Sequence, residues 1–266
     1  MGRLLRRSRR RTTVNATART ASPDSTKTVC PVCSREDTYV AYGAWLRDQL
    51  VCQRCHGGSV PRERAMALAL QMYIPDWREL RVLECSPAPR AISWVIGKEC
   101  RQYTPMNYFP AEPLGRVVGG VRNETLEDLS FPDESFDAFL ALDVMEHIPH
   151  PEMAVREISR VLTDQGTAIL TFPIRKGQTV PVQPRAQMRP DGSVEHLTEP
   201  EWHGDPFSDA GSLVFTDFGY DVHVWLGQMS DRNVHVIRFA DQTNGILGEY
   251  TDVCVLGQRI QPLGVE

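Results

Sequence analysis

The chain of 266 residues has no long apolar run, and this absence limits what kind of protein it can be. No stretch of about 18 consecutive apolar residues occurs, so we expect no membrane-spanning helix and no membrane partner. The N-terminal region also lacks the apolar centre of a secretory signal. We therefore expect a cytoplasmic protein with one large core and a small accessory module.

Acidic residues are missing from residues 1–22, which contain seven arginines. This composition predicts a disordered Arg-rich tail over residues 1–27, with a targeting peptide or a nucleic-acid-binding arm as alternatives. Removing the seven charges changes the formal net charge from −5 to −12 for residues 23–266. Because an acidic surface repels a phosphate backbone, we do not expect nucleic acid as a partner.

Four of the seven cysteines form two pairs with CxxC spacing, separated by 18 residues. The pairs are "CPVC" (Cys30 and Cys33) and "CQRC" (Cys52 and Cys55), and two such pairs can complete a tetrahedral metal shell. Disulfides are disfavoured in a reducing compartment, and a redox motif needs only one pair. The pattern therefore predicts structural Zn²⁺ in a small zinc ribbon, where four protein ligands leave no open position for catalysis.

The zinc-binding module is predicted to span residues 28–62 and to be followed by a linker helix at residues 63–75. Residues 28–64 carry five basic and four acidic side chains, so the module lacks the basic surface of a nucleic-acid-binding ribbon. His56, next to the last cysteine of the module, is assigned a surface or supporting role. The other three cysteines are predicted to be buried, unreactive thiols: Cys85, Cys100 and Cys254.

Apolar strands alternate with amphipathic helices after residue 76, which predicts a mostly parallel sheet covered on both faces. The predicted helices are 87–100 and 150–166, and 233–241 and 252–260 are predicted to be a closing pair of strands. Residues 174–215 show no clear periodicity and many prolines, as in a lid or substrate segment. The other predicted strands are 81–86, 101–108, 116–126, 136–144 and 166–173.

The segment "NETLEDLSFPDESFDAFLALDVMEHIPHPEMAVREISRVLTDQGTAILTFP" (123–173) resembles the middle of class I SAM-dependent methyltransferases. "RERA" (62–65), "ECSP" (84–87) and "EPEWHG" (199–204) further resemble a subgroup with an N-terminal zinc-binding region. The resemblance covers residues 76–266. It implies an α/β, Rossmann-like, seven-stranded class I methyltransferase sheet with S-adenosyl-L-methionine (SAM) as cofactor.

The resemblance also implies which residues bind SAM. The methionine part would lie at Glu84–Pro87, the ribose near Asn107, the adenine at Glu124–Leu126, and the reacting methyl beside Asp143 and Val144. The residues implied are Glu84, Ser86, Pro87, Asn107, Glu124, Thr125, Leu126, Asp143 and Val144.

The loop in "LRVLECSPAPRA" (80–91) has no glycine, where the family usually has a Gly-rich turn. Small residues and the N-terminus of the following helix still offer N–H groups and a positive dipole to a carboxylate. Ser86 can cap that helix or contact the ligand, although the prolines remove donors. We therefore expect the loop to keep a cofactor-binding role.

Methyl transfer from a sulfonium is an in-line displacement that depends on alignment and on exclusion of water. A hydroxyl or ammonium acceptor also needs a base, and His147 and His203 are the candidates, with structural hydrogen bonding as the alternative for both. We expect a small-molecule or glycan acceptor. The alternatives are a non-catalytic SAM-binding or zinc-ribbon interaction protein and an RNA methyltransferase, and the sequence does not indicate the oligomeric state.

Overall fold

The computed structural model describes residues 28–37, 39–205 and 208–260, so the tail predicted at residues 1–27 lies outside the described residues. Its centre is an eight-stranded mixed sheet with the strand order β17-β18-β10-β9-β5-β6-β8-β7. Strands β10, β9, β5, β6 and β8 run parallel, whereas β18, β17 and β7 pair antiparallel with their neighbours. The strands are β5 (Arg81–Cys85), β6 (Gln102–Asn107), β7 (Val117–Val118), β8 (Val121–Asn123), β9 (Phe136–Leu142), β10 (Leu162–Thr171), β17 (Arg232–Ile237) and β18 (Val253–Arg259).

The Rossmann-like sheet predicted from the sequence is confirmed, but it has one more strand than the seven predicted. Residues 116–126, predicted as one strand, contain the hairpin of β7 and β8. Gly119 and Gly120 form its turn with positive φ angles of 59° and 89°, a backbone conformation that favours glycine. The two-residue strand β7 therefore extends the sheet at its edge.

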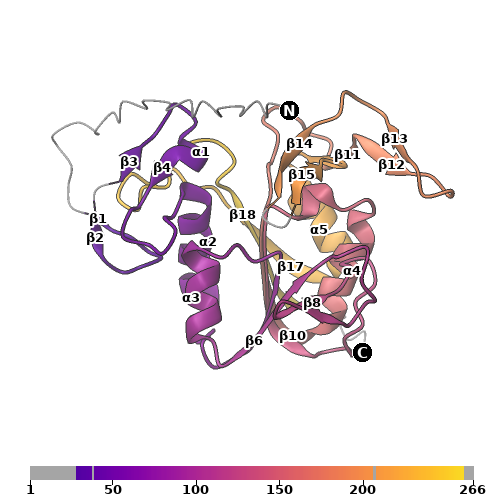
Figure 1. Cartoon of the computed structure of the whole chain (residues 1–266), viewed down its shortest axis with the longest axis horizontal. Coiled ribbons are helices and arrows are strands. Elements are labelled where there is room, and N and C mark those ends of the chain that lie inside the picture. The colour runs from indigo at the N-terminus through magenta and orange to yellow at the C-terminus, as the bar shows by residue number, and fades with distance from the viewer. Residues whose placement is uncertain (1–27, 38, 206–207, 261–266) are drawn as a thin grey trace, which may run out of the picture.

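Four helices cover the sheet, with α2 and α3 on one face and α4 and α5 on the other (Figure 1). Side chains of β9 alternate between the two cores: Ala138 and Leu140 pack on the α2 side, and Phe139 and Ala141 on the α4 side. Helix α5 was not predicted from the sequence. The helices are α2 (Pro61–Tyr73), α3 (Ala91–Glu99), α4 (Pro151–Val161) and α5 (Val222–Ser230).

The N-terminal module shares its core with one face of the sheet. One buried cluster contains residues of both parts: Cys30, Cys52 and Cys55 of the module, Trp77 of the turn after α2, and Val82 of β5. The guanidinium of Arg64 in α2 donates to the backbone carbonyls of Leu50 (2.8 Å) and Gly245 (2.6 Å), which links the module to the chain before β18. The module's elements are β1 (Thr28–Val29), β2 (Glu36–Asp37), β3 (Val40–Ala41), α1 (Leu46–Gln49) and β4 (Leu50–Val51).

The segment 174–215, whose sequence shows no clear periodicity, contains short strands. These strands are three to six residues long, too short for a periodic sequence pattern. The β12–β13 hairpin projects away from the body (Figure 1). The pairs are β11 (Val182–Pro184) with β16 (Thr216–Phe218), β12 (Ala186–Met188) with β13 (Val194–His196), and β14 (Trp202–Asp205) with β15 (Ser208–Leu213).

Helix α4 ends at Val161, whereas Gly166 was predicted to lie just past its end, because strand β10 already begins at Leu162. A short 3₁₀ helix, η1 (Met145–His147), follows β9. No helix of the described residues is both long and apolar enough to cross a membrane.

Arg232 fastens β17 to the neighbouring elements from a position that is only 1% exposed. Its guanidinium donates to five backbone carbonyls and to the hydroxyl of Ser159 at 2.9–3.1 Å. Burial lowers the pKa of Arg232 to about 10, so it remains charged at neutral pH. The carbonyls belong to Ser159, Leu162, Thr163, Gly166 and Gly257.

We predict that Arg232→Met lowers the free energy of unfolding by about 3 to 5 kcal/mol, because it leaves several buried carbonyls without a donor. The matched control is Arg101→Met, since Arg101 pairs with Glu79 on the surface, where loss of an ion pair costs less than about 1 kcal/mol. Equilibrium unfolding in urea measures both. Equal urea midpoints of unfolding for the two variants would contradict the role of Arg232 in anchoring β17.

Candidate functional site

A cavity of about 850 Å³ opens at the carboxyl ends of β5, β6 and β9, where ligands bind in open α/β sheets. Residues at the ends of four strands, β5, β6, β8 and β9, meet here, because the carboxyl ends of parallel strands lie at one edge of the sheet. The cavity brings together these residues predicted from the sequence: Ser86, Asn107, Glu124, Thr125, Leu126, Asp143, Val144 and His147.

Glu84 and Pro87 do not line this cavity, and their predicted role in SAM binding stays a prediction. Glu84 is 2% exposed, and its two carboxyl oxygens accept hydrogen bonds from Ser93 of α3 (2.5 Å) and Tyr103 of β6 (2.8 Å). Burial raises the pKa of Glu84 to about 7, against the opposing effect of these two hydroxyls. In the structure, the carboxyl group of Glu84 therefore connects β5 with α3 and β6.

Glu124 lines the cavity, but its carboxylate is engaged in structural contacts. It accepts hydrogen bonds from the Arg122 guanidinium and the Ser130 hydroxyl, both at 2.6 Å, and from the Ser130 backbone N–H at 3.0 Å. The Glu124 N–H itself donates to the Asn107 carbonyl at 3.1 Å. Glu124 therefore fixes the turn that carries Thr125 and Leu126.

The glycine-free loop after β5 adopts backbone conformations that glycine usually supplies. Ser86 and Ala91 have φ angles of 54° and 47°, which L-residues rarely adopt. The N-terminal module contacts this loop directly, since the Ala91 N–H donates to the His56 carbonyl at 2.9 Å. Helix α2 adds an ion pair between Glu63 and Arg90 at 2.9 Å. The His56 ring also stacks on Trp94 of α3, with centroids 4.6 Å apart. Contacts from the module thus hold the loop in place.

Asp143, at the end of β9, is held by two arginines of the N-terminal region. Its φ angle is 54°, and its Oδ2 lies 2.5 Å from Arg47 Nη2 and 3.0 Å from Arg62 Nε. Burial alone would raise the pKa of Asp143, but the two guanidiniums and Thr171 lower it below its ordinary value. Arg47 and Arg62 were not predicted to belong to the site, because nothing local in the sequence links them to Asp143.

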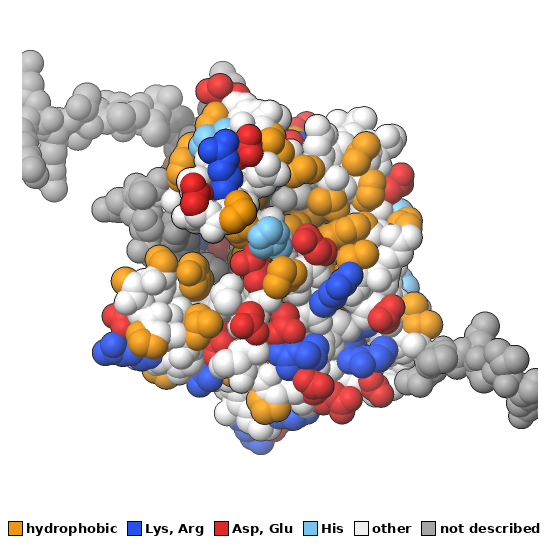
Figure 2. All heavy atoms as spheres, turned by 90° about the vertical axis from the view of Figure 1, so that its right-hand side faces the viewer, with side chains coloured by type: hydrophobic (Ala, Val, Ile, Leu, Met, Phe, Trp, Pro, Cys, Tyr) orange, Lys and Arg blue, Asp and Glu red, His pale blue; other side chains and the backbone are white. Residues whose placement is uncertain are grey.

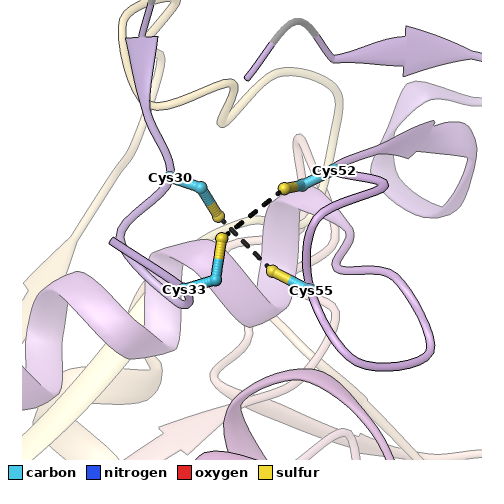
Figure 3. Close-up of side chains that lie close together, drawn as sticks. All are labelled: Cys30, Cys33, Cys52 and Cys55. Atoms are coloured by element: carbon cyan, nitrogen blue, oxygen red, sulfur yellow. Dashed lines mark hydrogen bonds between the residues drawn. The ribbon is translucent and has the colours of Figure 1, made fainter. Parts of the chain in front are cut away.

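The four cysteines of the module converge on one point (Figure 3). The Sγ atoms of Cys30 and Cys55 are 3.6 Å apart and those of Cys33 and Cys52 are 3.9 Å apart. Four sulfurs at about 2.3 Å from a tetrahedral Zn²⁺ would be about 3.8 Å from one another, so the spacing fits zinc. Four sulfur ligands would complete the tetrahedral shell and leave no open position for a substrate.

A second group of possible ligands lies at the cavity and consists of Glu146, His147 and His203. His147 Nε2 and His203 Nδ1 lie 3.8 and 3.7 Å from Glu146 Oε1, and the two rings meet edge to face at 5.1 Å. Glu146, followed by Glu201, raises the pKa of His203 against the effect of burial. His147 lines the cavity, as does Gly204 beside His203. The structure therefore brings together the two histidines predicted from the sequence.

Residues 98–170 match a family model described as a methyltransferase domain, and no curated protein matches the chain. A SAM-dependent methyltransferase from Mesorhizobium loti is 13% identical with a TM-score of 0.47, and the match covers 73% of this chain and 98% of that chain. The 1,6-didemethyltoxoflavin-N1-methyltransferase of Burkholderia thailandensis is 16% identical with a TM-score of 0.46, covering 75% and 79%. A chain in a complex of the Haloferax volcanii Trm112 methyltransferase activator is 10% identical with a TM-score of 0.48, covering 76% and 92%.

We predict that Glu84→Gln removes a pH dependence of stability, because the amide resembles the protonated carboxyl. A pKa raised from 4.5 to about 7 means that the stabilising proton is fully present below about pH 4.5 and lost as the pH rises through about 7. The free energy of unfolding of the wild type should fall relative to the variant by about 3 kcal/mol across this interval. Urea unfolding of both proteins at several pH values measures the difference. Parallel pH profiles would contradict a raised pKa.

We predict that the purified chain holds one zinc ion and that Cys33→Ser loses it. Zinc loss should lower the free energy of unfolding by roughly 3 kcal/mol or more, because binding of the metal is coupled to folding of the module. Cys100→Ser is the matched control, since Cys100 is another partly buried thiol outside the cluster. Elemental analysis and thermal unfolding give the two readouts, and full zinc content in Cys33→Ser would contradict the assignment.

Proposed function

We propose that the chain is a SAM-dependent methyltransferase that transfers a methyl group to a hydroxyl or amine of a small molecule or glycan. The match of residues 98–170 to a methyltransferase domain supports this proposal. The observation that carries the proposal is the cavity at the sheet edge, which combines a cofactor-sized space with two adjoining histidines. SAM, when bound, supplies an electrophilic methyl group on a sulfonium. The residues around it need to align the acceptor, exclude water and accept a proton.

We place the cofactor against the ends of β5, β6, β8 and β9. Ser86 and the start of α3 would face its carboxylate, since a helix N-terminus favours negative charge. Asn107, with an amide that can accept and donate, would face the ribose hydroxyls. Thr125 and Leu126 would contact the adenine, and Val144 would lie beside the reacting methyl. Asp143 would act through the backbone that it positions, because its carboxylate is engaged by arginines.

The acceptor would lie between the cofactor and the β14–β15 hairpin. Met188 and Phe215 supply apolar walls there and His147 a polar group, a combination typical of small-molecule sites. In the transfer, the acceptor's oxygen or nitrogen forms a bond to the methyl carbon as the carbon–sulfur bond breaks. The electron pair of that bond stays on sulfur, and the acceptor's proton passes to the nitrogen of His147 or His203.

Charge favours this acceptor class over RNA. The chain has a formal net charge of −5, which becomes −12 without the seven arginines of residues 1–22. On the face seen in Figure 2, basic and acidic side chains are interspersed and do not form a basic patch. Such a surface offers little attraction to a phosphate backbone.

We further propose that the four cysteines hold structural Zn²⁺ within a module of residues 28–62, joined by residues 63–75 to a methyltransferase domain of residues 76–266. Within that domain, residues 174–215 would form the lid over the acceptor. Zinc-ligating thiolates persist in a reducing compartment, so we place the protein in the cytoplasm.

We predict that His203→Ala lowers turnover about 100-fold or more while leaving affinity for S-adenosylhomocysteine within about twofold, because His203 adjoins the cavity without lining it. Calorimetric titration measures the affinity. Transfer of labelled methyl from SAM to hydroxylated and amino small molecules measures turnover, with His196→Ala on the projecting hairpin as the control. Absence of cofactor binding at millimolar concentration would refute the proposal. Methyl transfer to RNA, with an RNA affinity that falls steeply with salt, would show that RNA and not a small molecule is the acceptor.

A further inference from the structure

We propose that Glu146, His147 and His203 form a binding site for one divalent transition-metal cation at the acceptor side of the cavity. This site is separate from the cysteine cluster. It would hold a cation with three protein ligands, from η1 and β14, and leave coordination positions open toward the cavity. Sites built in this way are typical of catalytic metals, whereas a closed shell is typical of structural ones.

Each of the two histidines makes a hydrogen bond on the side of its ring away from Glu146, and this bond indicates which nitrogen carries a lone pair. His147 Nδ1 lies 2.9 Å from the Leu213 carbonyl, which can only accept, so Nδ1 carries the hydrogen and Nε2 the lone pair. His203 Nε2 lies 3.2 Å from the Glu201 carboxylate, so in the neutral ring Nε2 donates and Nδ1 carries the lone pair. These two lone-pair nitrogens are the ones that face Glu146 Oε1. Metal-binding histidines are fixed by carbonyl and carboxylate partners in the same way.

Glu146 supplies a negative charge that the surrounding protein does not balance with hydrogen bonds. Its side chain is 2% exposed, and neither carboxylate oxygen has a hydrogen-bond partner among the described residues. A buried carboxylate without partners is costly, and the two histidine nitrogens at 3.7 and 3.8 Å are too distant for hydrogen bonds. A cation between these three groups would satisfy the carboxylate.

The spacing of the three groups suits a metal ion. Two donors at about 2.1 Å from one tetrahedral ion lie about 3.4 Å apart. The nitrogens lie 3.7 and 3.8 Å from Glu146 Oε1, so a shift of a few tenths of an ångström brings them to that spacing. All ligand atoms of the group lie within 4.8 Å of one another.

The surrounding charges and backbone hold the ligands in position. Arg175 Nη2 lies 2.5 Å from Glu201 Oε2, and this ion pair holds the carboxylate whose other oxygen faces His203. The Phe215 N–H donates to the Glu146 carbonyl at 2.8 Å, and the Val214 N–H donates to the Glu201 carbonyl at 2.9 Å. The β14–β15 hairpin and η1 are thus joined at the site, so the ligands are fixed before a metal binds.

Two imidazoles and one carboxylate favour Mn²⁺, Fe²⁺, Co²⁺, Ni²⁺ or Zn²⁺ over Mg²⁺ and Ca²⁺, which prefer oxygen ligands. The consequence for catalysis rests on the proposed function. A histidine nitrogen that binds a metal cannot also accept a proton, so the cation would replace the histidines as the activating group. An acceptor hydroxyl bound at an open position would lose its proton to water, and its oxygen would then take the methyl group.

The test is titration of the zinc-loaded chain with MnCl₂ alone, followed by electron paramagnetic resonance of free and bound Mn²⁺. Mn²⁺ is suitable because the cysteine cluster favours zinc over it. We expect one bound Mn²⁺ per chain, with affinity reduced at least about tenfold in both Glu146→Gln and His203→Ala. His203 is 31% exposed at the side chain, so its truncation should preserve the fold. His223→Ala, an exposed histidine of α5, is the matched control and should bind as the wild type does.

Unchanged Mn²⁺ affinity in both variants, or no binding by the wild type at millimolar Mn²⁺, would overturn the proposal. Zinc content and S-adenosylhomocysteine affinity of the variants show that the module and the cofactor end of the cavity are intact. The metal measurement needs neither SAM nor acceptor. If the proposed function fails and the metal site is real, the chain will bind Mn²⁺ but will neither bind the cofactor nor transfer a methyl group.

Discussion

The contact between the N-terminal module and the carboxyl ends of β5 and β9 is the constraint on which the cavity depends. Ser86, Ala91 and Asp143 all have positive φ angles without being glycine, and such conformations persist only where the surroundings enforce them. His56 contacts Ala91, and Arg47 and Arg62 contact Asp143, whereas the Ser86 N–H donates to the Met106 carbonyl of β6 at 2.7 Å. The module therefore supports two edges of the cavity, at the loop after β5 and at the end of β9.

This dependence explains how a loop without glycine can serve a ligand site. In a loop of glycines, the backbone reaches a left-handed conformation without steric cost. Here the cost is offset by hydrogen bonds and ring stacking from an added module, which is itself stabilised by convergent thiols. The cysteine cluster, the packing of α2 and the form of the loop after β5 are in this way parts of one structural unit.

Hydrogen-bond and ion-pair partners divide the carboxylates around the cavity into different roles. Glu84 and Glu124 have hydrogen-bond partners for both oxygens and fix strands and turns, and Asp143 is neutralised by arginines. Glu146 differs because its oxygens have no such partners among the described residues. Sequence position alone would rank these acids alike, since each lies at or shortly after the carboxyl end of a strand. Only their surroundings distinguish a structural carboxylate from one that can serve a ligand.

The sequence by itself determined the parts of this protein that depend on local patterns. The apolar strands and amphipathic helices predicted the sheet, the CxxC spacing predicted the cysteine cluster, and residues 123–173 indicated the methyltransferase resemblance. Short pairs such as β14 and β15 were missed, because three to six residues carry too little periodicity, and so was α5. Tertiary structure alone decided that Arg47 reaches Asp143, 96 residues away, and that His203 meets His147. Such contacts depend on how distant elements pack, and burial and charge pairing arise only from that packing.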